Sequence, residues 1–247
     1  MPSSLTKSST ASLMEAFQIC GKICIFNKID PLKTIMIIPN DNRTHPLNGL
    51  VLIGGRSQRM GSPKEKIKWH GKEQVYYLAD LLRNYCKDVY ISCRPEQLDE
   101  IAVGKKMASN YAWLPDRYKD IGPMGGILTA FEFQSEQAWL VVACDLPILG
   151  PEAVDYLIQK RDPRRIATAF ISSKDNLPEP LFAIWEPYSL PIIQQMFAQN
   201  RLSPRQVLIE YYALCVQAPD LQTLTNVNTP TEAKIAEAMI TKKSQSS

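Results

Sequence analysis

The feature that most constrains the fold is a regular alternation of short apolar runs with amphipathic stretches, which begins at residue 49. Residues 49–53 (GLVLI) and 139–143 (WLVVA) are apolar throughout, as expected of strands that are buried on both faces. Residues 73–86 carry apolar side chains at helical spacing. Strands that alternate with helices in this way predict a three-layer α/β/α sandwich around a mostly parallel, Rossmann-like sheet.

The same patterns predict the remaining elements. Further strands are expected at residues 89–93, 166–171 and 181–184, and further helices at residues 124–133, 151–160, 188–198, 204–211 and 231–240. Sheets of this kind bind ligands at the carboxyl ends of their strands. The loops after residue 53, after residue 143 and before residue 124 are therefore the candidate binding loops.

The chain is expected to divide into three parts. Residues 1–48 are rich in Ser and Thr at the start and in turn residues at the end, which predicts a poorly ordered N-terminal extension. A small accessory element is the alternative for this segment. Residues 49–241 are expected to form one domain, and residues 242–247 a flexible tail.

Composition and charge exclude several classes of protein. The 247 residues are 45% hydrophobic, which excludes wholesale disorder. The formal net charge of +3, from 28 basic and 25 acidic residues, argues against a nucleic acid partner. A membrane span requires roughly 18 consecutive apolar residues, and no run in the sequence approaches that length. Neither nucleic acid nor membrane is an expected partner.

The cysteines and histidines do not have the spacing of a metal site. Of the six cysteines, Cys20 and Cys24 form the one close pair, and the two histidines, His45 and His70, lie far apart. A zinc site is therefore not predicted. Scattered cysteines in a chain of this length are typical of reduced thiols, so we expect a cytoplasmic protein.

A basic loop follows the first predicted strand. Gly54 and Gly55 come directly after residue 53, where a backbone without Cβ atoms can curl around a phosphate. From Arg56 to Lys72 there are six basic residues and one acidic residue, a net charge of +5. This loop suits a polyphosphate, although a solvated surface loop accounts for the composition equally well. The GxGxxG and GxxxxGK[ST] nucleotide motifs are both absent.

A single carboxylate follows the apolar run 139–143. Asp145 lies in the segment ACDLP at 143–147, directly after the predicted strand. An Asp at this place can cap the following turn, or it can offer Mg²⁺ a hard oxygen ligand beside a triphosphate. Both readings are compatible with the segment alone.

Five segments together resemble one family. The segment GGRSQRMG at 54–61, followed by Pro63, Lys64 and Gly71, resembles the signature loop of the molybdenum cofactor guanylyltransferases, which belong to the nucleotide-diphospho-sugar transferase type of fold. Ile53 and Pro63 depart from the family pattern, which has Ala and Asp there. Further matches follow in the order of the family: GPMGG at 122–126, ACDLP at 143–147, PEPLFA at 178–183 and NVNTP at 226–230. The resemblance covers residues 48–240.

The resemblance implies a nucleotidyltransferase that moves GMP from GTP to molybdenum-molybdopterin, forms the molybdopterin guanine dinucleotide cofactor and releases pyrophosphate. GTP and molybdenum-molybdopterin are the implied substrates and Mg²⁺ the implied cofactor. Proteins of molybdopterin synthesis and recipient molybdoenzymes are the implied partners. The attacking phosphate is anionic near neutral pH, so alignment and charge neutralisation are expected to supply catalysis without a general base.

The resemblance also implies roles for individual residues. Asp145 is expected to bind the metal, and Arg59 and Lys64 the phosphates. The residues expected to contact the nucleotide are Leu52, Ile53, Gly54, Gly55, Lys64, Asp116, Asp145 and Asn228. Cys93 occupies the position of a family Asn, and Asp120 is expected to be a surface residue.

Three alternatives stay open at this point. A cytidylyltransferase acting on the same pterin is the nearest, although the Gly54-Gly55 pair favours guanine by resemblance. A sugar-1-phosphate nucleotidyltransferase is a second, although the longer acceptor domain usual in that class does not fit this chain length. The third is a non-catalytic nucleotide-binding module in which residues 1–48 dock a partner, and the presence of Asp145 argues against it.

Overall fold

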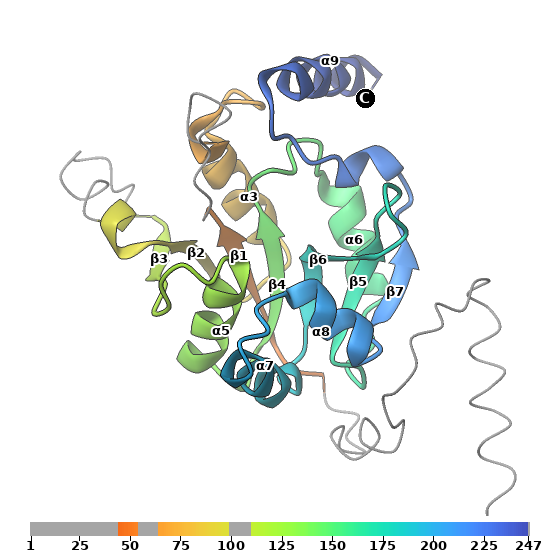
Figure 1. The fold of residues 1–247 in the computed structure, drawn as a ribbon. Helices are drawn as coiled ribbons and strands as arrows, with labels where there is room; N and C mark the ends of the chain where they lie inside the picture. Colours follow the sequence, from red (N-terminus) through yellow and green to blue (C-terminus); the bar gives the residue numbers. More distant parts are fainter. Residues whose placement is uncertain (1–43, 54–63, 99–109, 247) are drawn as a thin grey trace, which may run out of the picture.

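The computed structural model describes residues 44–53, 64–98 and 110–246 (Figure 1). The strands are β1 (Leu47–Leu52), β2 (Val89–Cys93), β3 (Ala112–Pro115), β4 (Ala138–Ala143), β5 (Ala167–Ile171), β6 (Pro178–Trp185) and β7 (Leu214–Gln217). The helices are α3 (Gln74–Leu82), α5 (Pro123–Phe133), α6 (Pro151–Gln159), α7 (Ser189–Ala198), α8 (Pro204–Glu210) and α9 (Pro230–Ser246), with the 3-10 helices η1 (Lys64–Lys66) and η2 (Leu221–Leu224).

Within the described residues the strands form one seven-stranded sheet in the order β3-β2-β1-β4-β6-β5-β7. β1 is parallel to both of its neighbours, β2 and β4, and β3 is parallel to β2. β6 runs antiparallel to β4 and to β5. The expected mostly parallel sheet is confirmed, and β6 is the strand that departs from it.

Helices cover both faces of the sheet, which confirms the three-layer sandwich. Alternate residues of β1 point to opposite faces, because side chains alternate along a strand. Val51 belongs to a core with residues of α3 and α6, whereas Leu50 belongs to a second core with residues of α5, α7 and α8. Both side chains are fully buried, as the apolar run at 49–53 predicted.

The last helix lies apart from these layers, above the carboxyl ends of β1 and β4 (Figure 1). Its buried residue Ala236 packs in a small cluster with Val227 and with Ile148 of the loop after β4. The helix runs to Ser246, six residues beyond its expected end at 240 and through most of the predicted tail. None of the helices in the described ranges is long and apolar enough to cross a membrane.

The ordered strand at the start of the domain begins earlier than expected. β1 starts at Leu47, and the guanidinium of Arg161 donates a hydrogen bond of 2.9 Å to the carbonyl of His45. Arg161 itself pairs at 2.6 Å with the fully buried Glu186, so this anchor is rigid. Residues 45–48 therefore pack with the sheet. Residues 1–43 of the predicted extension, including Cys20 and Cys24, lie outside the described residues.

Candidate active site

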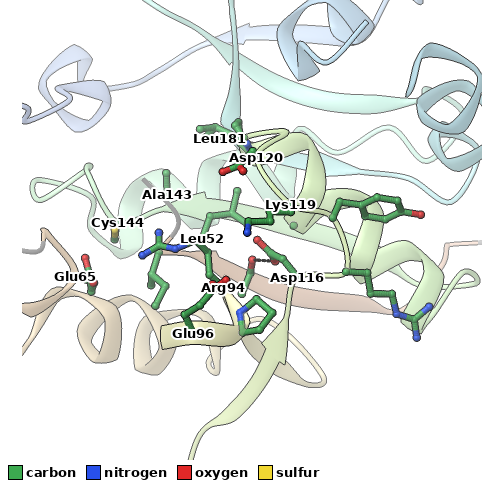
Figure 2. Close-up of a pocket in the computed structure, with 18 of the residues that line it drawn as sticks. Leu52, Glu65, Arg94, Glu96, Asp116, Lys119, Asp120, Ala143, Cys144 and Leu181 are labelled. Atoms are coloured by element: carbon green, nitrogen blue, oxygen red, sulfur yellow. Dashed lines mark hydrogen bonds between the residues drawn. The ribbon is translucent and has the colours of Figure 1, made fainter. Parts of the chain in front are cut away.

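A cavity of about 870 Å³ opens at the carboxyl ends of β1, β2, β3 and β4 (Figure 2). The start of β6 adds Leu181 to its wall, because β6 runs in the opposite direction. Four of the predicted site residues line the cavity: Leu52, Ile53, Asp116 and Asp145. The structure thus brings together residues from three different loops, at the place that the rule for parallel sheets indicates.

The loop after β4 presents Asp145 and is held from outside the cavity. Gln74 Nε2 donates to the carbonyl of Leu146 at 3.1 Å, and the Tyr77 hydroxyl donates to the carbonyl of Leu149 at 3.2 Å. His70 Nε2 lies 2.8 Å from the carbonyl of Pro147, so that nitrogen carries the proton. Because these partners come from α3 and the segment before it, the loop is fixed to a packed helix.

The environment of His70 keeps its imidazole neutral. Burial lowers the pKa of His70, and this effect outweighs the hydrogen bond to Pro147, which acts in the opposite direction. The ring also stacks on Tyr77 at a centroid distance of 3.8 Å. A neutral imidazole that donates to a backbone carbonyl is a structural support for the loop and carries no charge toward the cavity.

A second carboxylate lies near Asp145. In the pairing of β4 with β6, Val142 is opposite Phe182, so Glu179 stands at the level of Asp145. Burial raises the pKa of Glu179, and the nearby charge of Asp145 raises it further. The amide of Leu181, 3.2 Å from one carboxylate oxygen, and Arg205, 3.4 Å from the other, act in the opposite direction.

This set of donors fits Mg²⁺. Proteins bind Mg²⁺ through one or two carboxylates together with substrate phosphates, and seldom through a complete cage of side chains. Asp145 supplies one carboxylate in the cavity, and Glu179 lies close enough to add to the local negative charge. In the part of the chain that the structure describes, no three His, Cys, Asp or Glu side chains form a cage.

Asp116 enters the cavity from the end of β3. Its amide donates to the carbonyl of Cys93 at 2.8 Å, and the Ser92 hydroxyl donates to its Oδ1 at 2.6 Å (Figure 2). Burial raises the pKa of Asp116, while the Ser92 hydrogen bond and the charge of Arg94 lower it. The backbone and one carboxylate oxygen of Asp116 are thus both fixed.

At Gly126 of the GPMGG segment, the backbone of α5 lies so close to Leu52 and Ser92 that glycine is required. A Cβ atom at this position would lie 2.6 Å from Ser92 Oγ and 2.6 Å from Leu52 Cδ2, distances that real Cβ atoms do not show. Gly122, at the start of α5, has φ of 65°, a conformation that favours glycine. The two glycines let α5 approach the floor of the cavity.

The loop between β3 and α5 adds Asp120 to the residues that line the cavity. The side chain of Asp120 is exposed, as predicted, but it also lines the cavity together with Lys119 (Figure 2). Its φ of 58° turns the chain sharply before α5. The loop is anchored on α5, where Thr129 accepts a 3.0 Å bond from the amide of Arg117 and Glu132 accepts the hydroxyl of Tyr118.

Most of the basic loop after β1 lies outside the described residues. Arg59, Gly54 and Gly55 lie outside the described residues, and Lys64 is described only as the start of η1. Lys72 pairs with Asp80 of α3 and lies 5.8 Å from the centroid of the Tyr111 ring.

Other cations line the described cavity instead. They are Arg94, Arg117 and Lys119, none of which was predicted. Arg117 is 3.5 Å from Glu132, so part of its charge is compensated. Arg94 follows β2 directly, and the rule that ligands bind at the carboxyl ends of strands would have identified it.

Asn228 and Cys93 are not among the described residues that line this cavity. The amide of Val227 donates to the carbonyl of Asp145 at 2.9 Å, which brings the NVNTP segment beside the loop after β4. Asn228 itself is exposed, and its amide donates to Glu232 at 2.7 Å in the capping box that starts α9. Cys93 points into the core beneath the sheet, whereas Ser92 lines the cavity.

Comparison with known proteins agrees with this geometry. The family model described as the MobA-like NTP transferase domain matches residues 49–214. The molybdenum cofactor biosynthesis bifunctional protein of Synechocystis sp. is 32% identical over 242 residues, which cover 91% of this chain and 67% of that protein. A probable molybdenum cofactor guanylyltransferase of Geobacillus sp. is 30% identical over 189 residues, 74% of this chain and 94% of that protein.

Solved structures share the fold. The molybdopterin-guanine dinucleotide biosynthesis protein A of Archaeoglobus fulgidus superimposes with a TM-score of 0.63 at 21% identity, over 79% of this chain and 99% of that chain. A 4-diphosphocytidyl-2C-methyl-D-erythritol synthase of Anaerococcus prevotii gives a TM-score of 0.58 at 10% identity, over 80% of this chain and 99% of that one. Because the family model matches more than half of the chain and the Synechocystis relative matches most of it, the chain belongs to the MobA-like NTP transferase family and is a nucleotidyltransferase.

Proposed function

We propose that this protein transfers GMP from GTP to molybdenum-molybdopterin. An oxygen of the terminal phosphate of molybdopterin forms a bond to the α-phosphorus of GTP, the bond between that phosphorus and the oxygen bridging to the β-phosphate breaks, and pyrophosphate leaves. The observation that carries the proposal is that Asp145 and Asp116, which follow the parallel strands β4 and β3, both line one cavity at the carboxyl ends of those strands.

The names of the relatives support the choice of substrates. The protein from Pseudomonas aeruginosa, 30% identical over 193 residues, carries the name molybdenum cofactor guanylyltransferase, and the protein from Geobacillus sp. carries the name probable molybdenum cofactor guanylyltransferase. The segments that match the family motifs include both acidic loops of the cavity. GTP and molybdenum-molybdopterin are therefore the proposed substrates, with proteins of molybdopterin synthesis and recipient molybdoenzymes as partners.

Asp145 is proposed to hold Mg²⁺ with the phosphates of GTP, while Glu179 adds negative charge beside it. When bound, the ion neutralises phosphate charge and polarises the α-phosphate. Gln74 and Tyr77 hold the backbone of the loop that carries Asp145, so little reorganisation of this loop is needed when the nucleotide arrives.

The phosphates require cations besides the metal. Arg59 and Lys64 are proposed for this role by the family motif that contains them. Arg94 and Lys119 line the described cavity and add positive charge on the wall that Asp116 shares. The attacking phosphate is anionic near neutral pH, so these residues act by alignment and charge neutralisation.

The nucleoside is proposed to lie over the β1–β2–β3 half of the sheet. Leu52 and Ile53 line the cavity at the end of β1, and Asp116 faces it from the end of β3. Gly54 and Gly55 are proposed to contact the nucleotide through their backbones. Asn228 is proposed as a further contact from the segment that packs on the Asp145 loop.

We also propose a cytoplasmic location. Cys86 and Cys93 are buried free thiols, and burial raises the pKa of each to about 12. Such thiols are protonated and unreactive, as is usual in proteins of a reducing compartment.

A transfer assay with molybdenum-molybdopterin as acceptor tests the proposal. The chain, Mg²⁺ and acceptor are incubated with either GTP or CTP, and pyrophosphate and the dinucleotide product are measured. Preferential use of GTP is expected. Preferential use of CTP would make the protein a cytidylyltransferase of the same pterin, and tight GTP binding without pyrophosphate release would make it a non-catalytic module.

A further inference from the structure

Ser92 is a buried polar residue without a role in the mechanism described so far. It belongs to β2, is 1% exposed and still contributes to the lining of the cavity. Its hydroxyl donates to Asp116 Oδ1 at 2.6 Å, a short hydrogen bond of the kind that charged acceptors make. The bond is drawn as a dashed line in Figure 2.

The structure around this bond leaves little freedom for the carboxylate. The amide of Asp116 is held by the carbonyl of Cys93, which is the residue after Ser92 on the same strand. On the other side, a Cβ atom at Gly126 would lie 2.6 Å from Ser92 Oγ and 3.5 Å from Asp116 Oδ1, so the backbone of α5 packs directly against the pair. Side chain, strand and helix thus fix one orientation of Asp116.

With Oδ1 engaged by Ser92, the other carboxylate oxygen determines what the cavity can bind. Oδ2 accepts no hydrogen bond from the residues that the structure describes. A fixed, half-buried carboxylate favours a base edge with adjacent donors. Guanine has such an edge, with a ring N–H beside an amino group, whereas hypoxanthine lacks the amino group and cytosine has a ring acceptor beside its amino group.

We propose that Ser92 is a positioning residue that orients Asp116 to read the donor edge of guanine, and that Ser92 thereby contributes to the choice of nucleotide. The inference rests on the proposed function, because it assumes that a nucleotide base lies in this half of the cavity. Ser92 stands one position before Cys93, where the family motif has Asn. The hydroxyl supplies an orienting polar contact at this end of β2, while the Cys93 side chain packs in the core.

Nucleotide binding measured by calorimetry in Mg²⁺ tests this role. GTP and ITP are compared, because ITP keeps the ring N–H of guanine and lacks its amino group. We expect the wild type to bind GTP about tenfold more tightly than ITP, and Ser92→Ala to lose most of that preference. In a double-mutant cycle, Ser92→Ala should cause no further loss of preference when Asp116→Asn is already present.

Thr129→Val is the matched control. Thr129 is also 1% exposed, and its hydroxyl oxygen accepts a 3.0 Å hydrogen bond from the amide of Arg117 in the same loop. This substitution removes a buried hydroxyl without touching the Asp116 carboxylate, so the ratio of GTP to ITP affinity should remain that of the wild type. Melting temperatures of all the variants identify any that fail to fold.

The outcomes separate this inference from the proposed function. A wild-type chain that binds neither nucleotide contradicts the proposed function itself. A wild type that binds GTP without preference over ITP, or a Ser92→Ala variant that keeps the wild-type preference, overturns the role of Ser92 alone. Equal losses of GTP and ITP affinity in Ser92→Ala would show a purely structural hydroxyl and would also overturn it.

Discussion

The loop after β4 is held by side chains of a different helix, whereas the loop after β3 is held by the helix that follows it. Gln74 and Tyr77 of α3 donate to carbonyls of the first loop, so its side chains stay available to the cavity. In the second loop, Thr129 and Glu132 of α5 bind the residues next to Asp116.

The two designs suit different tasks. Asp145 is proposed to bind a metal ion beside the phosphates, an interaction that depends on charge more than on orientation. A loop clamped through its backbone is enough to place the carboxylate for this task. Asp116 is proposed to read a base, which needs orientation as well as position, and it has a hydrogen bond to the carboxylate itself. Substitutions in each loop should therefore affect different properties.

The largest effect is expected from Asp145→Asn. Loss of the carboxylate should reduce transfer by about 100- to 1000-fold, because it removes charge stabilisation at the phosphates. The melting temperature should stay within about 2 °C of the wild type, since the side chain is half-buried at a loop. Steady-state assays in Mg²⁺ measure the effect.

Asp88→Asn is the control for this variant. Asp88 is exposed and precedes β2 at the opposite end of the sheet, so the same change of charge there should leave the rate unaltered. Retained turnover in Asp145→Asn would refute the assignment of Asp145 to the metal.

A pair of glycine substitutions in α5 should have the next largest effect. Gly126→Ala places a methyl group 2.6 Å from Ser92 Oγ and should displace the Ser92–Asp116 pair, with a loss of GTP affinity of about tenfold or more and of roughly 1–3 kcal/mol in the free energy of unfolding. Gly125→Ala meets its nearest atom, Ile121 Cγ1, at 3.1 Å and should be close to neutral. Calorimetry and thermal denaturation compare the two; equal affinities in both variants would contradict the close packing.

A smaller effect is expected when the clamp on the other loop is removed. Gln74→Leu deletes the hydrogen bond to the carbonyl of Leu146, and it also removes a buried amide oxygen that has no partner among the described residues. Transfer should fall by about three- to tenfold through kcat, with little change in the KM for GTP. Tyr77→Phe, which loses the 3.2 Å hydrogen bond to the carbonyl of Leu149, should also lower the rate of transfer, but by a smaller factor. A change confined to KM would mean that this loop contacts the base.

The smallest effect concerns stability and pH. Burial raises the pKa of Asp116 above its ordinary value of 3.8. In the pH range between 3.8 and the raised pKa, the folded protein therefore binds more protons than the unfolded chain. The free energy of unfolding therefore falls as the pH rises through this window, and the penalty persists at neutral pH. Asp116→Asn should raise the melting temperature at pH 7, while GTP binding weakens. Thermal scans should show the difference narrowing toward pH 3.8; a constant difference would contradict this account.

Much of the fold follows from the sequence because strong apolar runs locate β1 and β4 and helical spacing locates α3 and α6. The short strands β3 and β7, four residues each, were missed because such segments show too little periodicity. The antiparallel direction of β6 could not be predicted either, because side chains alternate in the same way in a parallel and in an antiparallel strand.

Asp145 was predictable because it lies two residues after the apolar run of β4. Asp116 was predicted only through the family resemblance, because β3, which precedes it, was missed. Charge counting was less reliable: Lys72 contributes to the +5 of the basic loop, yet it is paired with Asp80 on α3. Lys119 was missed because its position depends on the turn at Asp120. No local sequence pattern predicts the positive φ of that residue.

The reversed direction of β6 has a consequence for how this enzyme can vary. The hairpin at residues 172–177 joins β5 to β6 at the same edge of the sheet as the cavity, and its own backbone bonds close it, with the amide of Ser172 donating to the carbonyl of Leu177 at 2.9 Å. The register of β6 is set further along, by Phe182 and the residues after it. Insertions in this hairpin, by evolution or by design, can therefore reshape the rim of the cavity near Leu181, while the half of the sheet that carries Asp116 stays as it is.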